Sequence, residues 1–258
     1  MLPGERSDNQ ESAYEQERAK YTVAFFGTGS EKTLSDKTAM QIAERLGQSM
    51  AREGHPIITG GFNSGVMEAA SRGADITAQE LGRDDLKPKG IAVGKESLTK
   101  NTKHAEVIDK ETLSERIADL IKENQASVVL SGGGGTINEL ISALSDKAVN
   151  ELLVAKGVAK LPEKPIVIVD PSGKHMDLMR FLSKQDPKML HWFEHMYHVG
   201  VYDENIDEAV QEVSRIIEDY FQKSLENEVS EDEKTWLDNH SVRGFLKKGE
   251  EFEQGEGI

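Results

Sequence analysis

Short and nearly unbroken apolar runs alternate along the chain with longer amphipathic stretches. Unbroken apolar runs are typical of strands that are buried on both faces of a parallel sheet. In the longer stretches apolar residues recur every three or four positions, as Met40, Ala43, Leu46 and Met50 do, which predicts helices with one buried face. The pattern predicts strands at 21–27, 56–61, 89–94, 126–133, 164–170 and 198–203, and helices at 35–53, 64–76, 112–125, 136–150, 174–184 and 204–223.

The alternation of strands and helices predicts the fold class. Strands joined by helical crossovers form a mostly parallel sheet. We therefore expect an α/β fold, a doubly wound Rossmann-like sheet with helices on both faces and the 198–203 strand at an edge. Residues 20–224 are assigned to one Rossmann-like nucleotide-binding domain, 1–19 to a polar N-terminal extension and 225–258 to an acidic C-terminal tail. Ligands of such folds bind beyond the carboxyl ends of the strands.

Composition narrows the range of partners. The net charge is −15, and residues 225–258 hold ten acidic against four basic side chains, with Trp236 and Phe245 as their only obvious anchors. This charge disfavours a nucleic-acid partner, because phosphate backbones are bound by basic surfaces. The absence of cysteine excludes disulfides, zinc–thiolate sites and thiol catalysis. With no apolar run long enough to cross a bilayer and no signal-peptide pattern, we expect a cytoplasmic protein without membrane contact.

Three predicted strands end in glycine-rich loops, at 25–30, 58–67 and 130–139. Glycine allows backbone N–H groups to converge on a ligand, and a helix that begins just beyond adds a positive dipole end that favours an anion. Glycines after strands also serve ordinary tight turns, so one such loop alone is weak evidence. Three at one sheet edge predict a phosphate site.

The known phosphate-loop motifs do not fit these loops. A Walker A loop needs Gly-Lys-Ser/Thr, but Gly135 is followed by Thr136 and Ile137. A dinucleotide fingerprint needs a third glycine that is missing after Gly27 and Gly29. The loops therefore favour a mononucleotide or a sugar phosphate over ATP hydrolysis or hydride transfer.

Glu139 has two interpretations. Thr136 and Glu139 have the spacing of a capping box, in which the glutamate bonds back to the helix start. Alternatively, Glu139 is a catalytic carboxylate beside the glycine loop. Helical geometry directs it away from the face that carries Leu140 and Leu144, so we expect something else, such as a second subunit, to close its cleft.

Arg116 follows another capping box, formed by Thr112 and Glu115, and so falls in the first turn of its helix. A cation at that place opposes the helix dipole. Most single arginines lie along the surface or pair with a nearby acid. Arg116 is placed where the helix dipole disfavours a cation and where an anion site is expected nearby. Such a departure from local preference indicates a functional residue instead.

These motifs, in this order and spacing, resemble the LONELY GUY (LOG) family, whose members were long mislabelled lysine decarboxylases and are similar to molybdenum-cofactor carrier proteins. The resemblance covers about residues 20–220. The matching positions lie in "GGFNSGVM", "ER" and "SGGGGTINE": Gly60, Gly61, Gly65, Met67, Glu115, Arg116, Gly132, Gly133, Gly135, Thr136 and Glu139.

The resemblance implies a phosphoribohydrolase that cleaves the N-glycosidic bond of a nucleoside 5′-monophosphate, such as AMP or a cytokinin riboside monophosphate, without a cofactor or metal. It implies Arg116 and Glu139 as the catalytic pair and a homodimer or higher homo-oligomer with sites beside the subunit interface. The substrate-binding residues expected with them are Gly27, Ser30, Gly60, Gly61, Gly65, Met67, Gly132, Gly133, Gly134, Gly135 and Thr136.

Some residues depart from the family pattern. Ser131 stands in place of the usual proline, Gly134 in place of a bulkier residue, Asn138 in place of a common acid, and Ile117 in place of a lysine. These departures are consistent with a divergent member that uses another purine or pyrimidine nucleotide or has lost activity. The rival interpretation is the same fold binding a nucleotide or molybdenum cofactor without turnover, as a carrier does.

Two further candidates have simple explanations. In "HWFEHMYH", His191, Glu194, His195 and His198 could hold a metal ion, but the order needed for a zinc peptidase is missing. The interleaved Trp192, Phe193, Met196 and Tyr197 favour packing or a subunit contact instead. Asp170 ends a predicted strand before Pro-Ser-Gly, where an aspartate usually forms a turn rather than a ligand contact.

Overall fold

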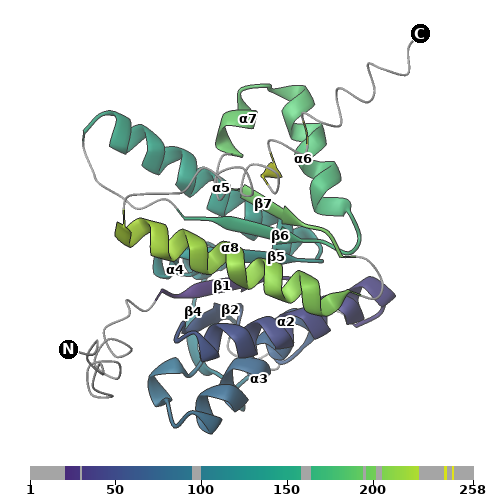
Figure 1. Ribbon diagram of the computed structural model, residues 1–258, viewed down its shortest axis with the longest axis vertical. Coiled ribbons are helices and arrows are strands. Elements are labelled where there is room, and N and C mark those ends of the chain that lie inside the picture. The colour runs from purple at the N-terminus through teal and green to yellow at the C-terminus, as the bar shows by residue number, and fades with distance from the viewer. Residues whose placement is uncertain are drawn as a thin grey trace, which may run out of the picture.

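The computed structural model describes residues 21–29, 31–94, 100–157, 164–193, 196–201, 205–226, 241–242 and 246 (Figure 1). Within them, parallel strands form one central sheet in the order β4-β3-β2-β1-β5-β6-β7. The strands are β1 (Val23–Phe26), β2 (Ile57–Thr59), β3 (Lys89–Val93), β4 (Glu106–Lys110), β5 (Ala126–Leu130), β6 (Ile166–Val169) and β7 (Met196–Val199).

Helices connect most of these strands and cover the sheet on both sides (Figure 1). This arrangement confirms the predicted doubly wound α/β fold. The helices are α2 (Leu34–Arg52), α3 (Gly65–Glu80), the 3-10 turn η1 (Asp84–Leu86), α4 (Leu113–Glu123), α5 (Gly134–Ala155), α6 (Lys174–Gln185), α7 (Met189–Trp192) and α8 (Ile206–Glu226).

The chain changes direction in the middle of the sheet. It starts at β1, builds outward through β2 and β3 to β4, and then returns to place β5 on the other side of β1. The crevice at such a reversal, beyond the carboxyl ends of the strands, is where this class of fold binds ligands. The loops after β1, β2 and β5, which carry the predicted glycines, all open there.

Two edge strands differ from the sequence prediction. β4 was missed, because its sequence EVIDK mixes charged and apolar residues and two of its five residues are exposed. Edge strands do not need the unbroken apolar run that identifies a central strand. β7 lies at the predicted edge but begins at Met196, two residues before the expected start at His198.

Each face of the sheet has its own hydrophobic core. Successive side chains along β1 and β5 point to opposite faces of the sheet. Phe25 packs in the core formed with α2, α3 and α8, and Phe26 packs in the core formed with α4, α5 and α6. Both phenylalanine side chains are completely buried. The unbroken apolar strands are therefore explained by burial on two sides.

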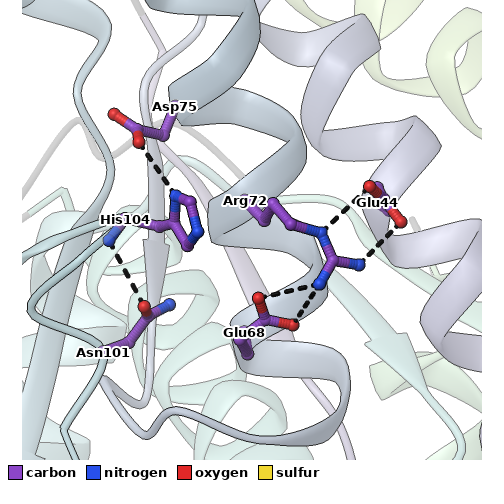
Figure 2. Close-up of polar contacts among 6 residues, drawn as sticks. All are labelled: Glu44, Glu68, Arg72, Asp75, Asn101 and His104. Atoms are coloured by element: carbon purple, nitrogen blue, oxygen red, sulfur yellow. Dashed lines mark hydrogen bonds and ion pairs between the residues drawn. The ribbon is translucent and has the colours of Figure 1, made fainter.

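Helices α2 and α3 lie side by side on one face and meet at small residues. A side chain at Gly47 of α2 would collide with the carbonyl oxygen of Ala70, and one at Gly73 of α3 would collide with that of Glu44. Arg72 of α3 then bridges the pair, donating to Glu44 at 2.8 Å and to Glu68 at 2.8 Å (Figure 2).

A second polar contact on α3 fixes the turn that precedes β4. Asp75 is buried in α3 and accepts from Nδ1 of His104 at 3.0 Å (Figure 2). The backbone N–H of His104 donates to the Asn101 side chain at 3.3 Å, and the N–H of Asn101 donates to the carbonyl of Gly61 at 3.0 Å. The turn at 101–105 therefore ties α3 to the loop that follows β2.

Part of the expected C-terminal tail packs onto the domain. Ser241 forms an antiparallel bridge with Tyr197 of β7, and Val242 and Leu246 are buried in the core on the α5 side. The expected anchors Trp236 and Phe245 lie outside the described residues. Among the helices that are described, none is both long and apolar enough to span a bilayer.

We predict that Gly47→Ala destabilises the fold, because the new methyl group meets the rigid backbone of Ala70. Contact with rigid backbone places the cost in the upper part of the usual overpacking range, at about 2–3 kcal/mol, and the better helix propensity of alanine returns about 1 kcal/mol. The free energy of unfolding, measured with urea, should fall by about 1–2 kcal/mol. An unchanged unfolding midpoint would show that the two helices can separate without cost.

Candidate functional site

The tetraglycine loop leads directly into α5. The helix begins at Gly134, and the N–H of Ile137 donates to the carbonyl of Gly133 at 3.0 Å. Thr136 is therefore inside the first turn and is not the residue that caps the helix. The capping-box interpretation of Glu139 is wrong, because the helix starts two residues earlier than the sequence pattern suggested.

Glu139 is instead paired with Arg116 of α4. Its Oε1 lies 2.9 Å from Nη1 of Arg116, and the two side chains are 8% and 7% exposed. The protein's own chain already covers Glu139, so its burial does not require a second subunit, and the expected subunit contact beside it stays a prediction. The family resemblance named these two residues as a pair, and in the structure they form one buried ion pair.

Several neighbours fix the Arg116 side chain. Thr112 and Glu115 form the predicted capping box at the start of α4, which sets where Arg116 lies in the first turn. Nε of Arg116 donates to the carbonyl of Ile91 in β3 at 2.9 Å. A side chain at Gly60, after β2, would collide with Nη2 of Arg116. Gly60 thus provides the space that the guanidinium occupies.

Phe62 completes the surroundings of Arg116 and was missed by the sequence analysis. The guanidinium carbon lies 5.7 Å from the centre of the Phe62 ring, which is within the range of a cation–π contact. The available signal was an aromatic residue directly after two glycines at the end of a strand.

Burial raises the pKa of Glu139 above its ordinary value, and the charge and hydrogen bond of Arg116 oppose this shift only in part. A carboxyl whose pKa is moved by desolvation beside one specific charge is typical of a functional site.

Other predicted glycines have packing roles in this structure. A side chain at Gly27 would collide with Val66, and Gly65, at φ +62°, lies against the carbonyl of Thr28. Gly61, at φ +74°, packs against the backbone of β3. Met67 is buried with its sulfur beside Gly60, and a side chain at Gly132 would collide with the buried Thr136. Their binding roles stay predictions.

Gly133, Gly134 and Gly135 are different. All three are exposed, have no positive φ, and a side chain at each would meet nothing within 4 Å. Neither backbone conformation nor packing inside the chain requires glycine at these places. The N–H groups of a first helical turn have no partners within their helix. The start of α5 therefore combines amides that lack helical partners with three exposed positions at which a side chain would meet no protein atom.

A second carboxylate, that of Asp170, contacts the glycine-rich loop after β5 through the hydroxyl group of Ser131. Asp170, after β6, accepts from the N–H of Ser172 at 3.0 Å and from the N–H of His175 at 2.6 Å, which confirms the predicted turn. The Ser131 hydroxyl donates to Asp170 at 3.4 Å, while the Ser131 carbonyl accepts from the N–H of Thr28 at 2.8 Å. Hydrogen bonds from His175 and Ser172 outweigh burial and hold the pKa of Asp170 well below its usual range.

The remaining candidates are not part of this arrangement. Ser30, Glu194 and His195 lie outside the described residues. Among the residues that the structure describes, no three histidine or acidic side chains are grouped to hold a metal ion. Phe193, Met196 and Tyr197 are buried, as the packing interpretation of this segment predicted, whereas Trp192 is 37% exposed.

Residues 20–164, which include both members of the ion pair and all three glycine loops, match the SLOG cluster4 family. The chain belongs to this family. The SLOG cluster4 family lies within the LOG/lysine decarboxylase-like Rossmann superfamily, so the resemblance found in the sequence motifs is confirmed. No match was found among curated protein sequences.

Solved structures show the same fold as this SLOG cluster4 protein. The molybdenum cofactor binding protein of the phototrophic bacterium Rippkaea orientalis is 20% identical with a TM-score of 0.50, over 77% of this chain and 98% of that one. The molybdenum cofactor carrier protein of Chlamydomonas reinhardtii is 19% identical with a TM-score of 0.50, over 78% and 99% of the two chains.

We predict that the Glu139 carboxyl of this SLOG cluster4 protein titrates above the ordinary glutamate value. Replacing the arginine in Arg116→Met should raise the pKa further, because the guanidinium is the group that lowers it. The measurement is an NMR titration of ¹³C-labelled glutamate carboxyls, with Glu139→Gln assigning the signal and circular dichroism checking the fold. Titration at or below the ordinary value would contradict the dominance of burial.

Proposed function

We propose that this protein is a nucleoside 5′-monophosphate phosphoribohydrolase, which uses water to split AMP or a cytokinin riboside monophosphate into free base and ribose 5-phosphate. One observation carries the proposal. The open glycines at the start of α5 and the buried Arg116–Glu139 pair belong to the same sheet edge, with Glu139 only one helical turn after Gly135.

The start of α5 suits the phosphate of such a substrate. A 22-residue helix directs its positive dipole end and unpaired amides toward the loop. There is no acidic residue in its first turn to repel an anion. Gly133, Gly134 and Gly135 leave room for phosphate oxygens to reach those amides.

The ion pair suits the bond that is broken. Glycosidic cleavage develops positive charge on the sugar ring, and a nearby carboxylate can stabilise it. Glu139 supplies that carboxylate, acting as the nucleophile at C1′ or as the base that takes a proton from the attacking water. Arg116 orients the substrate through charge-assisted hydrogen bonds. The base leaves with a proton and water supplies the new hydroxyl at C1′.

Assembly into a homodimer or a larger homo-oligomer in the cytoplasm is part of the same proposal. A groove of about 910 Å³ runs between α4 and α5, lined by Ile117, Ile121 and Val149. Leu113 and Leu152, on the same two helices, are 51% and 60% exposed. Apolar surface of this kind supports a subunit contact, because monomers rarely expose large apolar patches.

The second candidate is binding of molybdenum cofactor or a nucleotide without turnover. It is favoured by the two solved structures of the same fold, whose proteins bind or carry molybdenum cofactor. The residues that would hold such an anionic ligand are the same open glycines. A carrier has no evident need for the buried carboxylate beside them, so we rank hydrolysis first.

A product assay separates the two functions. A panel of nucleoside monophosphates is incubated with wild type, Glu139→Gln and Arg116→Met, and the released base is quantified by chromatography. We expect release by wild type and a loss of at least about 100-fold in both variants, as for groups that stabilise charge in the transition state. Glu80→Gln, which changes an exposed carboxylate at the end of α3, is the matched control and should behave as wild type.

Equal release by wild type and Glu139→Gln would remove Glu139 from the mechanism. Tight binding of a nucleotide or molybdenum cofactor with no release by wild type would instead favour the carrier.

The glycine cradle has its own test. Gly135→Ala should leave the free energy of unfolding unchanged or raise it by up to about 1 kcal/mol, because the methyl group meets no protein atom and favours helix. The same methyl group should weaken AMP binding about 10-fold or more by obstructing the amides. Calorimetry and urea unfolding measure the two effects, and a stable variant with normal AMP affinity would argue against phosphate binding at this loop.

A further inference from the structure

Phe62 presents an aromatic ring at the sheet edge where the ion pair lies. It directly follows Gly60 and Gly61 after β2, and its ring faces the Arg116 guanidinium at 5.7 Å. Arg116, Glu139 and Gly60 around it are buried, whereas Phe62 is only partly buried. The ring therefore keeps some apolar surface exposed beside a charged pair that is itself closed off.

The backbone holds Phe62 in place from several directions. Phe62 forms an antiparallel bridge with Lys100, whose ammonium group contacts Asp109 of β4 at 2.7 Å. The neighbouring Gly61 carbonyl accepts from Asn101, which belongs to the turn that His104 and Asp75 fix on α3 (Figure 2). The backbone that carries the ring is therefore fixed, so a ligand that contacts the ring loses little binding energy in ordering the loop.

We propose that Phe62 is the platform on which the base of the substrate stacks, and that it makes the site selective for ligands with a flat aromatic base over bare sugar phosphates. This inference rests on the proposed function for the identity of the substrate. It assigns a separate task to each part of the site. The α5 amides bind phosphate, the Arg116–Glu139 pair acts at C1′, and Phe62 binds the leaving group.

Stacking explains why an aromatic side chain stands at this place. Every nucleobase has a π-face, and stacking on an aromatic side chain contributes substantially to affinity whichever base is present. The Arg116 guanidinium, which is planar and faces the same ring, gives the neighbourhood a second flat surface. A base whose bond to the sugar is being cleaved must be held near the pair, and Phe62 is the aromatic side chain that contacts the pair among the described residues.

A different role for Phe62 makes a distinguishable prediction. If the ring served only to hold Arg116, its loss would disturb every ligand of the pair, with or without a base. If it stacks the base, its loss affects only ligands that carry one. Ribose 5-phosphate, the sugar product of the proposed reaction, has the phosphate and the sugar but no base, and is therefore the matched probe.

The experiment compares wild type, Phe62→Leu and Phe62→Tyr. Equilibrium affinities for AMP and for ribose 5-phosphate are measured by calorimetry with each protein also carrying Glu139→Gln, so that AMP is not consumed, and AMP turnover is measured alongside with Glu139 in place. We expect Phe62→Leu to weaken AMP binding about 10-fold or more while the affinity for ribose 5-phosphate stays within about twofold. Phe62→Tyr keeps the ring and should retain wild-type affinity for both, with circular dichroism confirming that all three proteins fold.

Three results overturn the inference. AMP affinity unchanged in Phe62→Leu means that the ring does not contact the base. Equal weakening of both ligands means that Phe62 acts through Arg116. A wild type that binds AMP no more tightly than ribose 5-phosphate has no platform for the base. Because these are binding measurements, selective AMP binding without turnover would remove the proposed hydrolysis and leave the platform standing.

Discussion

The buried contact between Arg116 and Glu139 is the constraint on which the site depends. Removing two charges from water is costly, and the cost is offset only when geometry and additional hydrogen bonds are good. Here the Ile91 carbonyl, the Phe62 ring and the space left by Gly60 all serve the guanidinium. Side chains from α4 and α5 and backbone from β2 and β3 must therefore converge correctly for this pair to exist.

The glycines divide into two groups that sequence alone could not separate. Gly27, Gly60, Gly61, Gly65 and Gly132 are required by neighbouring atoms of the protein or by a positive φ. Gly133, Gly134 and Gly135 have no such reason within the chain. The first group shapes the edge of the sheet, and the second leaves that edge open to a ligand.

The central fold could be predicted because strands that are buried on both faces of a parallel sheet consist of unbroken apolar runs in the sequence. The mixed sequence of β4 carried no such signal, and the burial of Val242 and Leu246 within an acidic stretch depends on a core formed by distant residues. The sequence identified Arg116 and Glu139 but not their contact. That contact depends on where α5 begins, and the tetraglycine run concealed the start of the helix.

The pKa values of two carboxyl groups at this edge of the sheet are shifted in opposite directions. Burial moves Glu139 toward its neutral form, while hydrogen bonds keep Asp170 ionised behind Ser131. On acidification, Glu139 is protonated while Asp170, which contacts the glycine-rich loop through Ser131, is still charged. A falling pH therefore removes the charge of the buried carboxyl that pairs with Arg116 before it alters the hydrogen bonds that support the glycine-rich loop.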